Sequence, residues 1–175
     1  MPNYKRTFVT GYDYFLTVVT HKRLPILIEN IELVRESFKI SKQEYCYTIK
    51  AVVILPEHFH MIINPKNARD YPNIIKTIKQ HFSKHCDPRY YQHIKQSESR
   101  TKAGYQPIWQ KKYYEHTIRD ESDFECRFNY VHFNPVKHGL VKKVKDWPFS
   151  SFHRYVAKGI YDQDWGNFDN NIDFE

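Results

Sequence analysis

Two runs rich in β-branched and aromatic residues, separated only by Pro56-Glu57, constrain the fold of this chain most. Tyr45–Leu55 and His58–Ile63 both have the composition of β-strands. Pro56 cannot donate a hydrogen bond to a sheet, so the first strand must end there. Strands joined by so short a connection pair antiparallel. We therefore expect a β-hairpin.

Further strands and helices flank this hairpin. Tyr12–Thr20 has the composition of a strand, and Glu29 to about Gln43 carries apolar residues at helical spacing. A second helix is expected to begin at Asp70-Tyr71-Pro72, where the missing N–H of proline costs little. This helix presents an apolar side to the core and a basic side outward: Ile74, Ile75, Ile78 and Phe82 form the first, and Lys76, Lys79 and Lys84 the second.

A last strand and a last helix follow. About Tyr113–Ile118 has the composition of a short strand. Asp120 can cap a helix, with Asp123 at the capping-box position. Pro135 disfavours helical geometry at the residue before it, so we expect this helix to end near Phe133.

The predicted order is β-α-β-β-α-β-α, with a loop at Asp87–Gly104, where no periodicity is visible. This order is of the α+β class and close to the ferredoxin-like split βαβ arrangement. We expect a mainly antiparallel sheet that carries the His58–Ile63 strand and has its helices on one face. Residues 1–160 are expected to form one domain, and residues 161–175 a tail.

Charge is distributed unevenly along the chain. The net charge is +7, but Tyr161–Glu175 contains five acidic residues and no Lys or Arg. The rest of the chain therefore has 27 basic and 15 acidic residues, a net of +12. A body this basic, interleaved with 14 Tyr and 12 Phe, suits a partner that carries phosphates and stackable bases. The acidic, aromatic tail could compete with such a partner, or could be a frayed end.

The tripeptide His58-Phe59-His60 is the first candidate for chemistry. Alternate residues of a strand share a face, so both imidazoles point one way and Phe59 points the other way into the core. Two neutral imidazoles on one face can hold a divalent metal ion. By itself, such a tripeptide is more often a pair of hydrogen-bonded histidines without a metal.

The second candidate is Tyr130 with Asn134. They stand four residues apart, so they share one face at the end of the last helix. A tyrosine hydroxyl can be a nucleophile, but its usual pKa near 10 keeps it protonated at neutral pH, so a metal ion or basic group is needed nearby. Taken alone, Tyr130 is more often a packing residue and Asn134 a helix cap.

The two segments together resemble a known family. Glu57-His58-Phe59-His60 is similar to the histidine–hydrophobe–histidine motif of HUH endonucleases, and Tyr130–Val136 with Lys137-His138-Gly139-Leu140-Val141 looks like the tyrosine helix of REP-associated tyrosine transposases. Asp146–Phe152 and Leu55-Pro56-Glu57 add to the likeness, which runs from about Tyr4 to Trp165.

The resemblance implies an activity and a set of site residues. Tyr130 would attack a phosphodiester of single-stranded DNA at palindromic hairpins, leaving a 5′-phosphotyrosine link and a free 3′-hydroxyl. His58 and His60 would bind Mg²⁺ or Mn²⁺. Asn134 matches the place of a third, amide ligand, for which insertion-sequence members often have the longer Gln. REP-associated members resemble self-contained monomers, although a dimer is possible.

Other basic residues are candidates for DNA contact. The resemblance places recognition of single-stranded DNA near Lys5 and Arg6. The helix lysines could follow a hairpin backbone, and three residues flank the tyrosine helix: Arg119, Lys137 and His138. For any one of these residues, a merely solvated basic face is as good an explanation.

Two alternative functions fit parts of the pattern. The first is a domesticated relative that binds hairpins but turns over little. The second is a phosphoesterase of the histidine-triad kind, but Ile62 occupies the position where a third same-face histidine would stand.

Composition also bears on location. Three separated cysteines argue against disulfides, no apolar run reaches the ~20 residues that span a bilayer, and the N-terminus lacks a secretory signal, so we expect a cytoplasmic protein.

Overall fold

A computed structural model describes residues 8–166 and shows one four-stranded sheet in the order β2-β3-β1-β4. Every neighbouring pair of strands is antiparallel. β3 is inserted between β1 and β2, as in the split βαβ arrangement that the sequence predicts, so this expectation is confirmed. The strands are β1 (Tyr14–Val19), β2 (Tyr47–Ile54), β3 (His58–Pro65) and β4 (Tyr114–Thr117).

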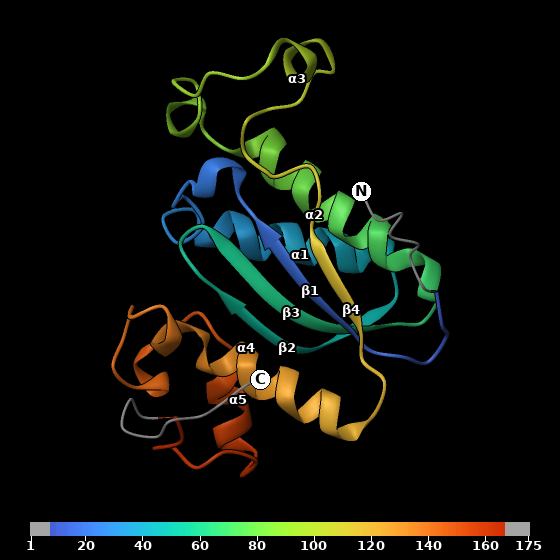
Figure 1. Cartoon of the computed structure of the whole chain (residues 1–175), viewed down its shortest axis with the longest axis vertical. Helices are drawn as coiled ribbons and strands as arrows, with labels where there is room; N and C mark the ends of the chain where they lie inside the picture. The colour runs from blue at the N-terminus through green and yellow to red at the C-terminus, as the bar shows by residue number, and fades with distance from the viewer. Residues whose placement is uncertain (1–7, 167–175) are drawn as a thin grey trace.

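Helices α1 (Ile31–Glu44) and α2 (Tyr71–His85) cover one face of the sheet (Figure 1). The apolar side chains of β1 and β3 on this face pack against both helices. Phe59 lies in this core, on the opposite face from its two histidine neighbours, as predicted. The predicted apolar stripe of α2 is also buried here: Ile74, Ile75, Ile78 and Phe82.

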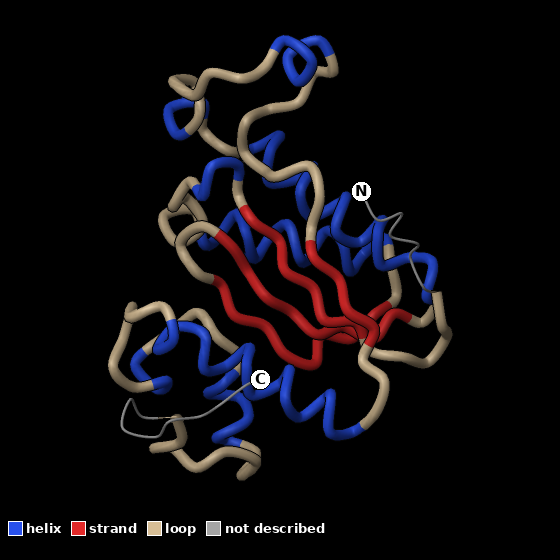
Figure 2. Tube along the Cα trace, in the orientation of Figure 1, coloured by secondary structure: helices blue, strands red, loops and turns tan. Residues whose placement is uncertain are grey.

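Helix α4 (Glu121–Lys137) lies on the other face, which corrects the expectation that all helices share one face (Figures 1 and 2). The physical reason is that β1 and β3 are apolar on both faces. Phe15 and Ile62 point away from α1 and α2 and form a second core with Val131 of α4. A sheet that is apolar on both faces needs a layer on each.

The end of α4 also differs from the prediction. The helix continues through Pro135 to Lys137 instead of ending near Phe133. Val131, Asn134 and Val136 are buried, so packing against the sheet outweighs the loss of one backbone hydrogen bond at Pro135. The start of the helix is as predicted, because the Asp120 carboxylate accepts a hydrogen bond from the Asp123 N–H at 2.8 Å.

Two short helices were not predicted. α3 (Glu98–Lys102) lies in the segment expected to be a loop, which also contains a 3₁₀ turn, and α5 (Phe152–Ala157) follows α4. Neither is long enough to show apolar periodicity. The 3₁₀ turns of the described residues lie at His21–Arg23, Ala68–Asp70, Pro88–Tyr90 and Val144–Asp146.

The segment before α5 covers the outer edge of β2. Ser151 N donates to Val52 O at 2.9 Å, and Ile54 N donates to Phe149 O at 2.8 Å. The Trp147 indole N–H also donates to Ile54 O. An exposed strand edge invites unwanted pairing, so this segment protects the sheet.

The last described residues belong to the second core. Tyr161 is buried, and its hydroxyl donates to Asn129 Oδ1 at 2.6 Å. Trp165 packs against the Tyr161 ring, with centroids 4.5 Å apart. The aromatic packing therefore continues past residue 160. Residues 167–175, with most of the predicted acidic tail, lie outside the described range. Within that range, no helix has the length and apolar character required to cross a membrane.

Candidate functional site

The two histidines of β3 lie on the sheet face that α4 covers. The His58 and His60 ring centroids are 4.8 Å apart. Strand register places Thr17 of β1 beside His60, and Tyr114 of β4 beside Thr17. A row of side chains therefore crosses the sheet from His60 to its edge. Ile62 points into the core on this face, so no third histidine extends the pair along β3.

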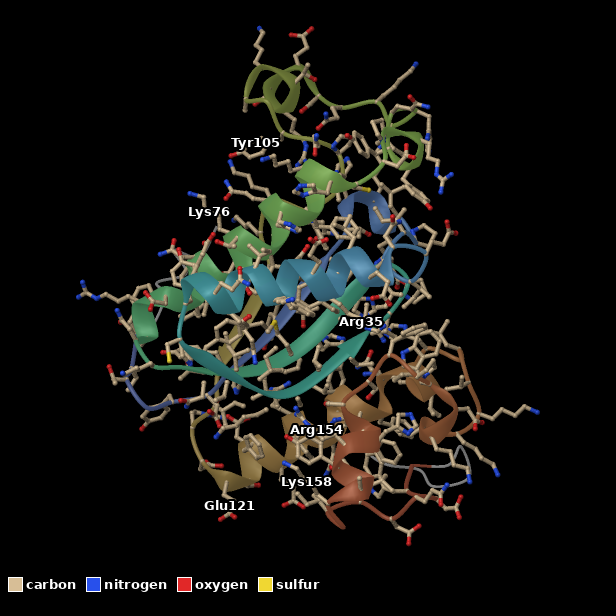
Figure 3. All side chains as sticks on the ribbon, turned by 180° about the vertical axis from the view of Figure 1, so that it is seen from behind. Arg35, Lys76, Tyr105, Glu121, Arg154 and Lys158 are labelled. Carbon is tan, nitrogen blue, oxygen red and sulfur yellow. The ribbon has the colours of Figure 1, made fainter. Side chains whose placement is uncertain are left out.

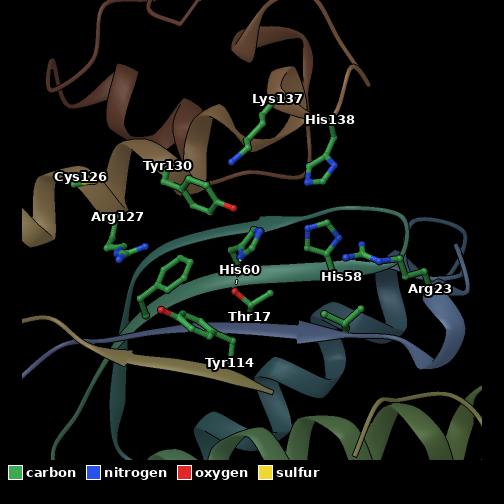
Figure 4. Close-up of a pocket in the computed structure, with 12 residues that line it drawn as sticks. Thr17, Arg23, His58, His60, Tyr114, Cys126, Arg127, Tyr130, Lys137 and His138 are labelled. Atoms are coloured by element: carbon green, nitrogen blue, oxygen red, sulfur yellow. Dashed lines mark hydrogen bonds between the residues drawn. The ribbon is translucent and has the colours of Figure 1, made fainter. Parts of the chain in front are cut away.

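Tyr130 projects from α4 toward this pair (Figure 4). Its ring centroid lies 5.3 Å from that of His60. Lys137 Nζ lies 4.6 Å from the Tyr130 ring centroid, and the His138 ring lies 5.1 Å from that of His58. The structure thus brings together the two motifs, about seventy residues apart in the sequence, in one groove between α4 and the sheet, with a cavity of about 500 Å³.

Asn134 lies below the surface of this groove, with 0% of its surface exposed. Its Nδ2 donates to the Tyr130 carbonyl oxygen at 3.3 Å, which is a weak bond within the helix. Its Oδ1 is buried and has no hydrogen-bond partner of normal geometry among the described residues. A buried amide oxygen without a partner is costly unless a ligand satisfies it. Burial lowers the pKa of His60, and a hydrogen-bond-like contact with the Asn134 side chain partly opposes this shift.

Burial keeps both imidazoles of the pair neutral. It lowers the pKa of His60 well below 6.5 and lowers the pKa of His58, although the Glu57 carboxylate opposes the second shift. The Glu57 carboxylate lies 3.1 Å from His58 Nδ1, and Thr17 Oγ1 lies 2.8 Å from His60 Nδ1. When each Nδ1 is engaged in this way, each Nε2 is left as the available metal ligand.

The residues predicted to contact DNA lie in different parts of the structure. Lys137 and His138 line the groove, whereas Arg119 borders a smaller cleft at the start of α4. Lys5 and Arg6 lie outside the described residues. The three lysines of α2 lie on the opposite side of the sheet from the groove, as the position of Lys76 shows (Figure 3).

Lys79, predicted to contact DNA and otherwise explained as part of a solvated basic face, has a partner within the protein. Its Nζ donates to Gln110 O at 2.7 Å, and burial lowers its pKa to about 8. It therefore anchors the segment that leads into β4.

Several further groove residues were not singled out from the sequence, among them Thr17, Arg23, Tyr114 and Arg127. Arg127 stands three residues before Tyr130 and so shares its helix face, which is a signal that the sequence offers. Thr17 and Tyr114 reach the groove through strand register, which no local pattern reveals. Arg23 forms an ion pair with Glu57 at 3.4 Å.

A helix that presents a tyrosine to two same-face histidines on an antiparallel sheet defines a class of DNA-processing enzymes, and comparison with known proteins agrees. Residues 8–134 match the family model described as "Transposase IS200 like", and the chain belongs to this family. The resemblance inferred from the two motifs is thereby confirmed.

Individual relatives narrow the assignment. The REP-associated tyrosine transposase of Escherichia coli strain K12 is 35% identical over 94% of this chain and 91% of its own length. A Haemophilus influenzae protein, named as a candidate REP-associated tyrosine transposase, is 38% identical over 95% of this chain and 94% of its own length. The chain thus falls within the REP-associated tyrosine transposases, enzymes that nick and rejoin DNA.

A solved structure agrees in fold. A REP-associated tyrosine transposase bound to a REP hairpin is 33% identical, and the match covers 98% of this chain and 95% of that chain with a TM-score of 0.78.

Proposed function

We propose that this chain cleaves and rejoins single-stranded DNA beside hairpins, with Tyr130 as the nucleophile. In this reaction the Tyr130 oxygen forms a bond to phosphorus and the bond from phosphorus to O3′ breaks. The phenolic proton is released to solvent and the leaving O3′ takes up a proton from solvent, so the products are a 5′-phosphotyrosine and a 3′-hydroxyl. Rejoining reverses these bond changes.

The observation that carries this proposal is the position of Tyr130. Its ring lies 5.3 Å from that of His60 and 4.6 Å from the Lys137 ammonium, inside the groove between α4 and the sheet. The groove is lined by three cations, Arg23, Arg127 and Lys137, which suit a phosphodiester backbone. All of these groups come from one chain, which supports a self-contained monomer.

The groove residues also fit a divalent metal ion. Among the described residues, no group of three His, Cys, Asp or Glu side chains has the arrangement of a metal site, so we look to another type of side chain for a third protein ligand. The buried Oδ1 of Asn134 is such a ligand, and His58 and His60 are neutral as metal binding requires. Mg²⁺ or Mn²⁺ held there would polarise the phosphate and stabilise the leaving oxygen.

The remaining groove residues have roles of their own. Lys137 stabilises the negative charge that develops on the Tyr130 oxygen and the phosphate. Glu57 and Thr17 hold the two imidazoles in one orientation. Recognition of a hairpin is supported by the solved relative, which is bound to a REP hairpin.

Covalent capture tests the proposal. The protein is incubated with Mg²⁺ and a labelled hairpin that carries single-stranded flanks, and the adduct is resolved in denaturing gels. We expect an adduct from the unchanged protein and none from Tyr130→Phe, while hairpin binding is retained. Tyr105→Phe is the matched control, because Tyr105 is an exposed tyrosine far from the groove (Figure 3).

Two outcomes contradict the proposal in different ways. A normal adduct yield from Tyr130→Phe would show that another residue is the nucleophile. Tight hairpin binding without any adduct from the unchanged protein would instead show a hairpin-binding protein with little turnover.

A further inference from the structure

One end of the groove has an exposed aromatic residue beside a cation. Tyr114 is 53% exposed, although it lies on a strand of the sheet. Its register opposite Thr17 places its side chain on the groove face of the edge strand β4. The Tyr114 ring thus lines the groove and is open to a ligand there.

A buried ring supports Tyr114 from below. The Phe15 and Tyr114 ring centroids are 6.1 Å apart in an edge-to-face arrangement, and Phe15 also contacts the Tyr130 ring at 5.9 Å. Phe15 is itself buried. Tyr114 is therefore the ring of this group that keeps a large surface open to a ligand, and it is linked through one residue to Tyr130.

Arg127 completes this end of the groove. Its guanidinium carbon lies 5.5 Å from the Phe15 ring centroid, and its Nε lies 3.6 Å from an Asp123 carboxylate oxygen. That Nε is buried and has no hydrogen-bond partner in the part of the chain that the structure describes. Asp123 is held in turn by the Arg119 N–H at 3.1 Å and the His116 ring at 2.7 Å. Arg127 is thus fixed in place at the groove wall.

We propose that this end of the groove is a nucleotide subsite, in which a base of the single-stranded flank stacks on Tyr114 and its phosphate pairs with Arg127. The inference rests on the proposed function and adds a position on the DNA to it. Two strand spacings separate β4 from β3, so the Tyr114 backbone lies about 10 Å from that of His60. A base stacked on Tyr114 would therefore belong to a nucleotide near the cleaved phosphodiester. Stacking on a ring accepts any base, so the subsite favours single strands without selecting a sequence.

Binding measurements without cleavage test this subsite. Every protein carries Tyr130→Phe and is kept in EDTA, so neither the nucleophile nor a metal ion is needed. Fluorescence anisotropy compares a hairpin with single-stranded flanks and the same hairpin without them. We expect Tyr114→Ala to weaken binding of the flanked hairpin by about tenfold and to leave binding of the unflanked hairpin unchanged. Tyr114→Phe should keep the affinity, because it keeps the stacking face.

Tyr105→Ala provides the matched control. Tyr105 is exposed to 51%, almost as much as Tyr114, but lies in the protruding segment around α3 (Figure 3). Its substitution should change neither affinity. Arg127→Ala should reduce the slope of log Kd against log salt for the flanked hairpin by about one, as expected for one lost phosphate contact.

An abasic scan locates the base and needs no change at Tyr114. One abasic position in the flank should cause the same loss as Tyr114→Ala, and combining the two should cause no further loss. The proposal is overturned if no single abasic position weakens binding, or if Tyr114→Ala weakens flanked and unflanked hairpins equally. Since cleavage is never measured, these outcomes do not depend on whether Tyr130 is the nucleophile.

Discussion

Lys137 Nζ lies 4.6 Å from the ring centroid of Tyr130, seven residues earlier on α4. Seven residues are almost two helical turns, so both side chains leave the same face of the helix. A fixed ammonium over the ring attracts the electron-rich π face and the negative charge that the oxygen acquires as it attacks. The helix therefore supplies both the proposed nucleophile and a cation that favours its reactive form.

Removing this charge should slow the covalent step. We expect Lys137→Met to lower the single-turnover rate of adduct formation by roughly tenfold or more, and Lys137→Arg to retain most of it. Quenched-flow sampling on denaturing gels measures the rate. Lys142→Met controls for loss of one exposed lysine a few residues further along. Equal rates for Lys137→Met and the unchanged protein would show that the ammonium contributes only to packing.

The proposed metal ligands should differ in importance. His58→Ala and His60→Ala each remove one of two imidazoles and should abolish both cleavage and tight Mn²⁺ binding. Asn134→Ala should cost less, because an amide is a weaker ligand. Calorimetric Mn²⁺ titration and adduct yield rank the three variants, with Asn73→Ala, at an exposed asparagine of α2 outside the groove lining, as an amide control. Cleavage that persists undiminished in EDTA would contradict the metal role.

Stability should fall in acid because of His132. This residue has no exposed surface, its ring nitrogens contact Ser151 Oγ at 2.8 Å and Tyr161 Oη at 3.2 Å, and burial lowers its pKa to about 3. The unfolded chain takes up a proton near pH 6.5, whereas the folded chain does so only near pH 3. The contribution of neutral His132 to the free energy of unfolding is therefore fully present above pH 6.5. It falls as the pH drops from 6.5 toward 3, by up to about 1.4 kcal/mol per pH unit.

Urea unfolding between pH 4 and 8 measures this effect. His58 and His60 act in the same direction, so the test is the difference between the unchanged protein and His132→Gln. The variant should be less stable at pH 8 but should lose less stability on acidification. His153→Gln controls for an exposed histidine. Parallel curves for the unchanged protein and His132→Gln would show that His132 is not the titrating group.

The position of Tyr161 and Trp165 predicts where the chain can be shortened. Ending the chain at Ile160 removes both rings from the second core and should destabilise the fold by about 3 kcal/mol or more, which corresponds to a fall in Tm of roughly 6–12 °C. Ending it at Gly166 keeps both rings in the second core and should avoid this loss. Calorimetry of the two shortened proteins distinguishes these outcomes, and similar Tm values would contradict the packing seen here.

The chain ending at Gly166 also provides a clean test of the acidic tail. It lacks Asp169, Asp173 and Glu175 but keeps the aromatic packing. If the missing residues compete with DNA, this protein should bind single-stranded DNA more tightly, and the gain should shrink as salt rises. Titrations at two salt concentrations measure it. Equal affinities at low salt would leave the tail without a role in binding.

Local sequence patterns predicted much of this molecule because they depend on short-range geometry. The alternation in His58-Phe59-His60 placed the two imidazoles on one face, and the four-residue spacing of Tyr130 and Asn134 placed both on one side of α4. The order of helices and strands followed from periodicity. These inferences need only the repeat of a strand or helix.

Long-range contacts escaped prediction for a physical reason. Tyr114 faces the groove because β1 and β4 pair in one register, and no local pattern encodes that register. Lys79 has the same charge as its neighbours, yet a carbonyl from residue 110 holds it. The expected end of α4 near Phe133 was wrong because tertiary packing outweighed the local preference of Pro135.

The two cores on opposite faces of the sheet have an evolutionary consequence. The core beneath α1 and α2 and the core on the groove side have no buried residue in common. Substitutions among residues such as Ile74 or Ile78 alter stability without touching the histidines or the tyrosine. Selection for thermal tolerance and selection for a new DNA target can thus act on separate halves of one small protein, and progress in one need not undo the other.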